Sequence, residues 1–491
     1  MRRLPLSLSL VSLLTVTNVI FSPAFAQSNA PVPPTEAVPA TSEKSTESTE
    51  SGEGDFLKTF DAPRAVVRLS LLESPFHLRH GLSHLSMNQS LGIARSWHSA
   101  VHWSLAHVLD PEPKGFAAAI AVISYLAANE LLATLPLSPA WMHEEWHRAV
   151  LTHRGIASHN TINDFRPFKN TYAVSGQTDE ELSQLKKLYP KDQLRLSVAG
   201  DESEREFVLS IEKDRFFRNQ NTADWASMLL TSLGSVFYLR ESANGNNDAL
   251  TEADEKNEGM SVADRDFIGM DYLGWVRDLF RPQEPFASRG VHPSGVGVRR
   301  YTKQTDLTSE EKDYLSRQAK LHFLNLVSPQ MFGWKQWTIL SPTTGRALGL
   351  NGSFAHYLTP FGYAVKLNLF MKTMIKETPF GTQGLYFAWQ QNFNKSKSTP
   401  QIEIEHRPLM LKDSAWGLGA RVMAWLQPQG QDFLAESAEA GGLLGVKLMH
   451  RGLFGVQPWF EAEAKSSGWV AGQVDLGRTY SLRAGVEALL H

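Results

Sequence analysis

The feature that most constrains the fold is a strict alternation of apolar and polar side chains that begins after about residue 345. Between 361 and 371, Phe361, Val365 and Leu367 belong to an apolar row, while Lys366 and Asn368 fall between its members. A period of two predicts β-strands with two different faces. About nine such segments of roughly ten residues follow one another from 347 to 490, joined mostly by short turns, so we expect an antiparallel meander.

The meander is long enough to form an antiparallel β-barrel of about 8–10 strands, with two possible settings for its apolar face. In a soluble barrel that face points inward, whereas in an outer-membrane barrel it meets lipid and the polar face fills the lumen. The polar face favours the second setting, because small and charged residues could pack there as a salt-bridged lumen: Gly417, Gly419, Gly445, Gly455, Arg421, Lys447, Glu461, Glu463, Asp475, Arg483 and Glu487.

This half resembles bacterial outer-membrane β-barrels, in its alternation and in the last segment, "YSLRAGVEALLH", which is similar to their C-terminal assembly signal. It differs from them by ending on His491 rather than an aromatic residue, and by an odd strand count. Either a tenth strand lies upstream, in "MFGWKQWTIL", or one strand has been counted as two. A soluble or membrane-adjacent barrel is the alternative.

Residues 1–26 have the features of a secretory signal peptide: Arg2 and Arg3, an apolar core, and Ala24-Phe25-Ala26 before the cleavage point. Residues 27–54 are rich in Pro, Ser, Thr and Glu, and we expect a disordered linker there. The chain contains no cysteine, so disulfides and a lipid-anchored cysteine are excluded. A net charge of −3 argues against a nucleic-acid partner.

The stretch from 55 to 340 is predicted to be mainly helical, followed by the barrel over 341–491, which makes the chain α+β and multidomain. Residues 115–135 are apolar on all sides except for Glu130. The segment is long enough to cross a membrane, but its many alanines favour a helix buried in the core.

The sequence "HEEWH" at 143–147 lies in a helix with clear end signals. Ser138 can cap its first turn, Pro139 suits the first helical position and Gly155 suits the left-handed residue after its end. In a helix spanning about 139–154, His143 and His147 lie one turn apart on the same face, so both imidazoles can reach one metal ion.

This stretch resembles the H-E-x-x-H helix of the zincin metallopeptidases, matched here by His143, Glu144 and His147. The resemblance covers about 15 residues. It implies Zn²⁺ as cofactor, the two histidines as ligands, Glu144 as general base and a helical zincin-like domain that hydrolyses peptide bonds.

The third ligand is less constrained. His153 has the spacing of an extended zincin motif, but a continuous helix turns it about 240° away from His147. The resemblance to the glutamate zincins implies a carboxylate from a later helix instead, and we predict Glu204, which shares a face with Val208 and Ile211 and can turn toward the interior. Asp201 would cap that helix, and a capping role for Glu204 is the alternative. His153 and other acids such as Asp271 remain open. His98 and His102 form another pair at helical spacing, for which an ordinary helix is favoured over a second metal site.

Taken together, these patterns predict an exported zinc-dependent hydrolase of the bacterial cell envelope, a metalloprotease acting on a peptide or protein substrate. The expected location is the outer membrane, in contact with its lipid and with a periplasmic domain; a soluble periplasmic protein is the alternative. The competing hypothesis for function is a non-enzymatic outer-membrane barrel whose helical periplasmic domain binds or scaffolds a partner.

Overall fold

A computed structural model describes residues 65–490, apart from 110–114, 134, 136, 163–171, 219, 221–223, 246–247, 341–346, 374–383, 412–413 and 453–454. The predicted signal peptide at 1–26, the predicted linker at 27–54 and the terminal His491 lie outside the described residues. Residues Leu57–His491 belong to one compact unit. The helices and the sheet therefore share one folded body.

The second half of the chain forms an antiparallel sheet, as the alternation predicted, and the sheet has ten strands. Their order is β1, β12, β11, β10, β9, β8, β7, β6, β5, β4. The strands are β1 (Ala65–Ser74), β4 (Trp337–Leu340), β5 (Ala347–Thr359), β6 (Gly362–Thr373), β7 (Gly384–Phe393), β8 (Ser398–Met410), β9 (Trp416–Pro428), β10 (Ala438–His450), β11 (Val456–Lys465) and β12 (Thr479–Leu490). A separate two-stranded ribbon pairs β2 (His159–Ile162) with β3 (Tyr172–Ser175).

The sequence patterns did not predict one of the strands, and they predicted one strand that the structure does not contain. β1, from the stretch expected to be helical, pairs with β12, so that Ala65 faces Leu490 across the ladder. The upstream strand suspected in "MFGWKQWTIL" is confirmed as the short β4. The segment 470–476 contains no strand. Its alternation arises from a loop that bends at Gly472, with φ of 81°, and packs Val470 into the interior.

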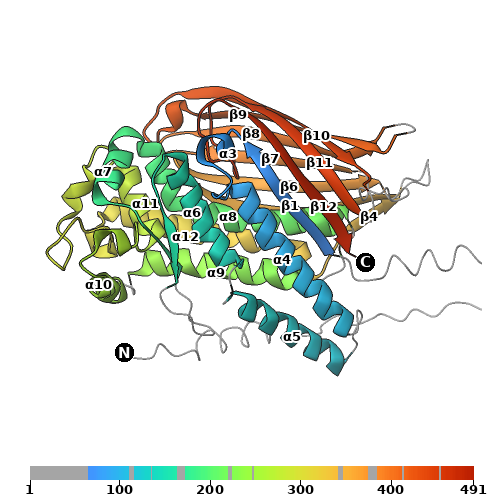
Figure 1. Cartoon of the computed structure of the whole chain (residues 1–491), viewed down its shortest axis with the longest axis horizontal. Coiled ribbons are helices and arrows are strands. Elements are labelled where there is room, and N and C mark those ends of the chain that lie inside the picture. The colour runs from blue at the N-terminus through green and yellow to red at the C-terminus, as the bar shows by residue number, and fades with distance from the viewer. Residues whose placement is uncertain are drawn as a thin grey trace, which may run out of the picture. The chain divides into compact units, whose positions relative to one another are not determined.

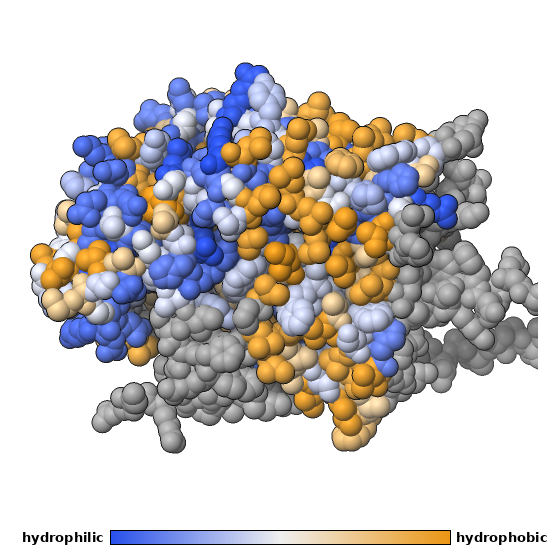
Figure 2. All heavy atoms as spheres, in the orientation of Figure 1, coloured by the Kyte–Doolittle hydropathy of each residue, from blue (hydrophilic) through white to orange (hydrophobic). Residues whose placement is uncertain are grey.

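The sheet places its apolar row outward and its polar row inward. On β9, Leu418, Val422 and Leu426 are exposed, whereas Arg421 points inward to Glu403 at 2.8 Å. Figure 2 shows apolar side chains gathered over the strands. Within the described residues β1 and β4 do not pair with each other, so the sheet is open and a closed barrel is not confirmed.

Helices cover the inner side of the sheet (Figure 1). They are α3 (Phe76–His80), α4 (Met87–Val108), α5 (Phe116–Ala133), α6 (Pro139–His153), α7 (Asp179–Leu188), α8 (Pro190–Phe217), α9 (Asp224–Asn244), α10 (Asp248–Asn257), α11 (Asp271–Phe280) and α12 (Ser309–Leu321). The long α8 contacts α6, α9 and α11 as well as β5 and β6. This helix therefore connects the helical layer to the polar face of the sheet.

Two expectations about helices are wrong. Asp201 does not cap a helix, because α8 starts at Pro190 and Asp201 lies buried in its middle, where it accepts a hydrogen bond from Ser235 at 2.9 Å. The predicted core helix at 115–135 is α5, and it lies at the surface, with Phe116 82% and Ile123 65% exposed. Among the described helices, none is both long and apolar enough to cross a membrane.

Candidate metal centre

Helix α6 forms as its end signals predicted. The Ser138 side chain accepts a hydrogen bond from the Trp141 backbone N–H at 3.1 Å, Pro139 is the first residue, and Gly155 follows the helix with φ of 72°. Helical spacing then places His143 and His147 on one face, with ring centroids 4.9 Å apart.

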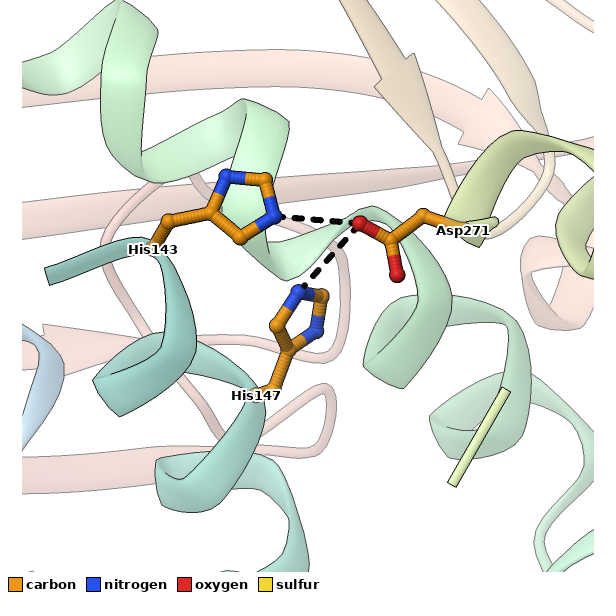
Figure 3. Close-up of side chains that lie close together, drawn as sticks. All are labelled: His143, His147 and Asp271. Carbon is orange, nitrogen blue, oxygen red and sulfur yellow. Dashed lines mark hydrogen bonds and ion pairs between the residues drawn. The ribbon is translucent and has the colours of Figure 1, made fainter. Parts of the chain in front are cut away.

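Asp271, the first residue of α11, brings a carboxylate to this pair (Figure 3). Its Oδ2 atom lies 3.0 Å from Nε2 of His143 and 3.5 Å from Nε2 of His147. One potential ligand atom from each of the three residues lies within 4.8 Å of the others. All three are buried, so this group could hold a metal ion away from bulk water.

The ring of His147 is oriented as a metal ligand requires. Its Nδ1 atom is 2.5 Å from the backbone oxygen of Leu196, which can only accept a hydrogen bond from an N–H at that nitrogen. Nε2 is therefore left as the free acceptor, and it is buried without a hydrogen-bond partner among the described residues. Two imidazole nitrogens and a carboxylate oxygen are a donor set that suits a divalent transition metal.

Glu204 lies beside this group on the opposite side of the His143 ring. Its Oε1 atom is 3.1 Å from Nδ1 of His143, whereas Nε2 of that ring faces Asp271. A carboxylate on the far nitrogen of a histidine fixes the orientation of the ring. The structure thus places the predicted third ligand next to the site, but gives the position shared with both histidines to Asp271.

Burial and neighbouring charges shift the pKa values of His143 and Asp271. Burial disfavours the charged form of His143, but hydrogen bonds to Asp271 and Glu204 raise its pKa well above the ordinary value. Burial likewise disfavours the Asp271 carboxylate, yet His147 and His143 lower its pKa. The arrangement therefore favours a positive charge between the histidines and the carboxylates, and a bound cation would supply it.

Gly200 allows α8 to approach the site closely. A Cβ atom at this position would collide with Nε2 of His143, so only glycine leaves the imidazole its place. No local pattern in the sequence indicates this role, because Gly200 is 57 positions from His143 and the contact depends on packing of α8 against α6.

A pocket of about 830 Å³ opens beside the group and includes His143, Glu144 and Asp271 in its wall. Burial raises the pKa of Glu144, although both histidines lower it. The described wall carries no lysine or arginine but seven carboxylates: Glu144, Glu204, Asp254, Glu258, Asp264, Asp266 and Asp271. The pocket wall is therefore acidic, although burial raises the pKa of Asp266 and Glu258 and so favours their neutral forms.

Tyr238 adds a hydroxyl group to the same pocket. Its oxygen accepts a hydrogen bond from the Asp271 backbone N–H at 3.2 Å, and its ring centroid lies 6.4 Å from that of His143. The phenolic proton remains free to be donated. Sequence reasoning missed Tyr238 because it comes from α9, far from both α6 and α11 in the chain.

The other histidines that the sequence singled out lie elsewhere. His153 borders a small pocket with His80 and Asp475, outside the candidate metal group, as the rotation argument expected. His98 and His102 are buried, and both contact the hydroxyl of Ser227, at 3.2 and 3.1 Å. Among the described residues no third ligand joins this second pair.

Comparison with models of protein families, with curated proteins and with solved structures finds no match for this chain. The chemistry of the site is therefore argued from its own residues.

Proposed function

We propose that this protein is a zinc-dependent hydrolase of the bacterial cell envelope that cleaves peptide bonds. One observation carries the proposal: the buried group of His143, His147 and Asp271 shares a pocket wall with Glu144, the acid of the H-E-x-x-H sequence. A metal site with a neighbouring carboxylate that is not needed as a ligand is the arrangement that hydrolysis requires.

His143, His147 and Asp271 would hold the ion, with Asp271 as the third ligand in place of Glu204. The fit rests on Nε2 of His147, which makes no hydrogen bond to the described residues, and on the donor set of two imidazoles and one carboxylate. When bound, zinc acts as a Lewis acid that polarises a carbonyl group and makes water more acidic.

The remaining residues would manage protons and orientation. Glu144, in the pocket wall, would accept a proton from the attacking water and pass it to the leaving amine, a role that a raised pKa assists. Tyr238 would donate its free phenolic proton in a hydrogen bond to the oxygen that gains negative charge. Glu204 and the Leu196 backbone oxygen would orient the two imidazoles.

We further propose that the outer face of the sheet contacts outer-membrane lipid, with the metal pocket on the periplasmic side. The support is the row of exposed apolar side chains on neighbouring strands, among them Val422 on β9 and Leu444 and Val446 on β10 (Figure 2). Val422→Arg should then impair assembly by about 2–4 kcal/mol near the midplane. Recovery of the wild-type protein in the soluble periplasmic fraction without detergent would refute lipid contact.

Metal analysis and a pair of neighbouring glutamates test the enzymatic proposal. The purified protein should contain about one equivalent of zinc, and His143→Ala should lose it. Glu144→Gln should keep the zinc but lose at least a hundredfold in hydrolysis, because it removes the base and not a ligand. Glu145→Gln is the matched control, since Glu145 instead pairs with Arg148 at 2.5 Å.

The same measurements identify the competing function. A metal-free, inactive wild-type protein with native folding would support a binding or scaffolding role for the helical part. Full activity of Glu144→Gln on a substrate of the wild type would show that the assigned mechanism is wrong.

A further inference from the structure

A second cavity, of about 250 Å³, lies between α8 and the polar face of the sheet. Its wall includes residues of β1, β6, β8, β9, β10, β11 and β12, and it shares no residue with the wall of the metal pocket. Eight lysines or arginines and six aspartates or glutamates line it, and two further carboxylates, Glu73 and Glu463, pair with the lining Arg483. Buried charge of one sign needs a partner of the other sign.

Most of these cations have a protein partner. Arg421 contacts Glu403 at 2.8 Å and Arg483 contacts Glu461 at 2.9 Å, for example. Six of the eight form ion pairs of this kind: Arg68, Lys213, Arg218, Lys366, Arg421 and Arg483. Within the described part of the chain, Arg407 and Lys447 alone among the eight have no carboxylate within ion-pair distance.

Arg407 is the more informative of the two. Its side chain is buried, with the residue 7% exposed, and its Nε and Nη2 atoms have no hydrogen-bond partner among the described residues. These two nitrogens form the edge of the guanidinium group that binds two oxygens of one oxyanion side by side. The neighbouring Phe217 ring, 5.4 Å from the guanidinium carbon, contacts the group without satisfying those donors.

Lys447 faces the same space from β10. Its ammonium group lies 4.3 Å from the centroid of the Trp459 ring. Glu461 stands opposite Lys447 in the ladder, but its carboxylate is engaged by Arg483. Lys447 therefore retains hydrogen-bonding capacity toward the cavity.

The backbone keeps the space between these two cations open. A register shift between His406 and Leu409 places Arg407 in an irregular segment of β8. On the intervening strand β9, Gly419 pairs with Lys447 and lies against the His406 carbonyl, where a Cβ would come within 3.2 Å of that oxygen. Gly419, which lines the cavity, thus keeps a side chain out of this part of the wall.

We propose that this cavity binds a phosphate group between Arg407 and Lys447. Arg407 and Lys447, the two lining cations without a described carboxylate partner, match the charge of a phosphate dianion, and the free edge of Arg407 offers the bidentate contact that phosphate oxygens accept. The volume accommodates one phosphate group with several waters. The ligand is either free phosphate or the phosphate of a lipid headgroup.

Titration of the full-length protein with inorganic phosphate, at constant ionic strength, tests this site by calorimetry and by the midpoint of thermal unfolding. The wild type should bind one phosphate and unfold at a higher temperature when it is present. Arg407→Gln and Lys447→Gln should each weaken binding at least tenfold, whereas Lys395→Gln, which removes a cation outside the cavity, should not.

The phosphate-free protein provides a readout that distinguishes a ligand site from a structural role. Arg407→Gln should then unfold no earlier than the wild type, because the change removes a buried charge without leaving any described carboxylate unpaired. A lower midpoint for this variant without phosphate, or an unchanged affinity in both cavity variants, would overturn the proposal. So would a folded wild type that binds no phosphate group in any form.

A short-chain phosphatidic acid, compared with a phosphatidylcholine of equal chain length, separates the two sources. Competition between the phosphatidic acid and inorganic phosphate would assign the cavity to a lipid phosphate. Binding of inorganic phosphate with no competition from either lipid would assign it to the free ion.

Discussion

Changing Glu204 and Asp271 separately distinguishes a metal ligand from a residue that orients a ligand. Glu204 makes one contact with the group, 3.1 Å from Nδ1 of His143, the nitrogen that does not face Asp271. Glu204→Gln should therefore remove no ligand atom. The expected loss is that of an outer-sphere partner, about 10–100-fold in zinc affinity, or about 1.4–2.8 kcal/mol.

Asp271→Asn should weaken zinc binding more than Glu204→Gln does, because it neutralises the one carboxylate that reaches both histidines. The affinities are measured by competition with a zinc-chelating dye, using protein stripped of metal beforehand. His153→Ala is the control that keeps wild-type affinity, since His153 lies in a different pocket. Loss of zinc in Glu204→Gln together with retention in Asp271→Asn would refute the assignment of ligand and orienting roles.

Three further predictions follow from charge and burial. Because acidic side chains line the metal pocket, peptides with lysine or arginine beside the cleaved bond should be hydrolysed faster than otherwise identical peptides with glutamate. Added salt should reduce the difference between the two rates of hydrolysis. Equal rates for the two peptides would contradict the prediction. Glu202→Ala should lower the free energy of unfolding, measured by denaturant titration, by about 3–5 kcal/mol, because it leaves the buried Arg195 without the carboxylate that pairs with it at 2.7 Å. A loss below about 1 kcal/mol, which is typical of a surface ion pair, would contradict this prediction. Burial, with the neighbouring His102, lowers the pKa of His98 to about 3, so the unfolded chain binds a proton below about 6.5 that the folded protein does not. The free energy of unfolding should therefore fall as pH drops from about 6.5 toward 3, and His98→Gln should flatten this slope; an unchanged slope would show that other groups set it.

The sequence predicted those parts of the fold that depend on local pattern. From β5 to β12 each strand carries its own alternation, which predicted that Arg421, Lys447 and Arg483 share one face of the sheet; that face lines a cavity, where little free space was expected. β1 was missed because its partner, β12, is more than 400 residues away in the chain. The alternation at 470–476 predicts a strand, but apolar residues that point inward from a loop can also alternate with polar residues.

In the candidate site, too, some features depend on local spacing in the sequence and others on contacts between distant segments. His143, Glu144 and His147 lie in one helix, so their spacing alone placed them together. The third ligand depends on how α8 and α11 pack against α6, which no local signal encodes. Glu204, the predicted third ligand, does lie beside His143. The prediction assumed a helix starting at Asp201, whereas α8 begins 11 residues earlier, at Pro190.

The pairing of β1 with β12 determines when the molecule can mature. Within the described residues, β1 pairs with one strand of the sheet, and that strand, β12, is the last of the ten to be synthesised. Until β12 arrives, the backbone edge of β1 and the α4 face packed on it have no completed sheet to join. Because α4 also packs against α6, the histidine helix acquires its final support only after β12 has paired with β1. The metal group can therefore reach its final geometry only late in folding, and any hydrolytic activity of the proposed site would begin only then.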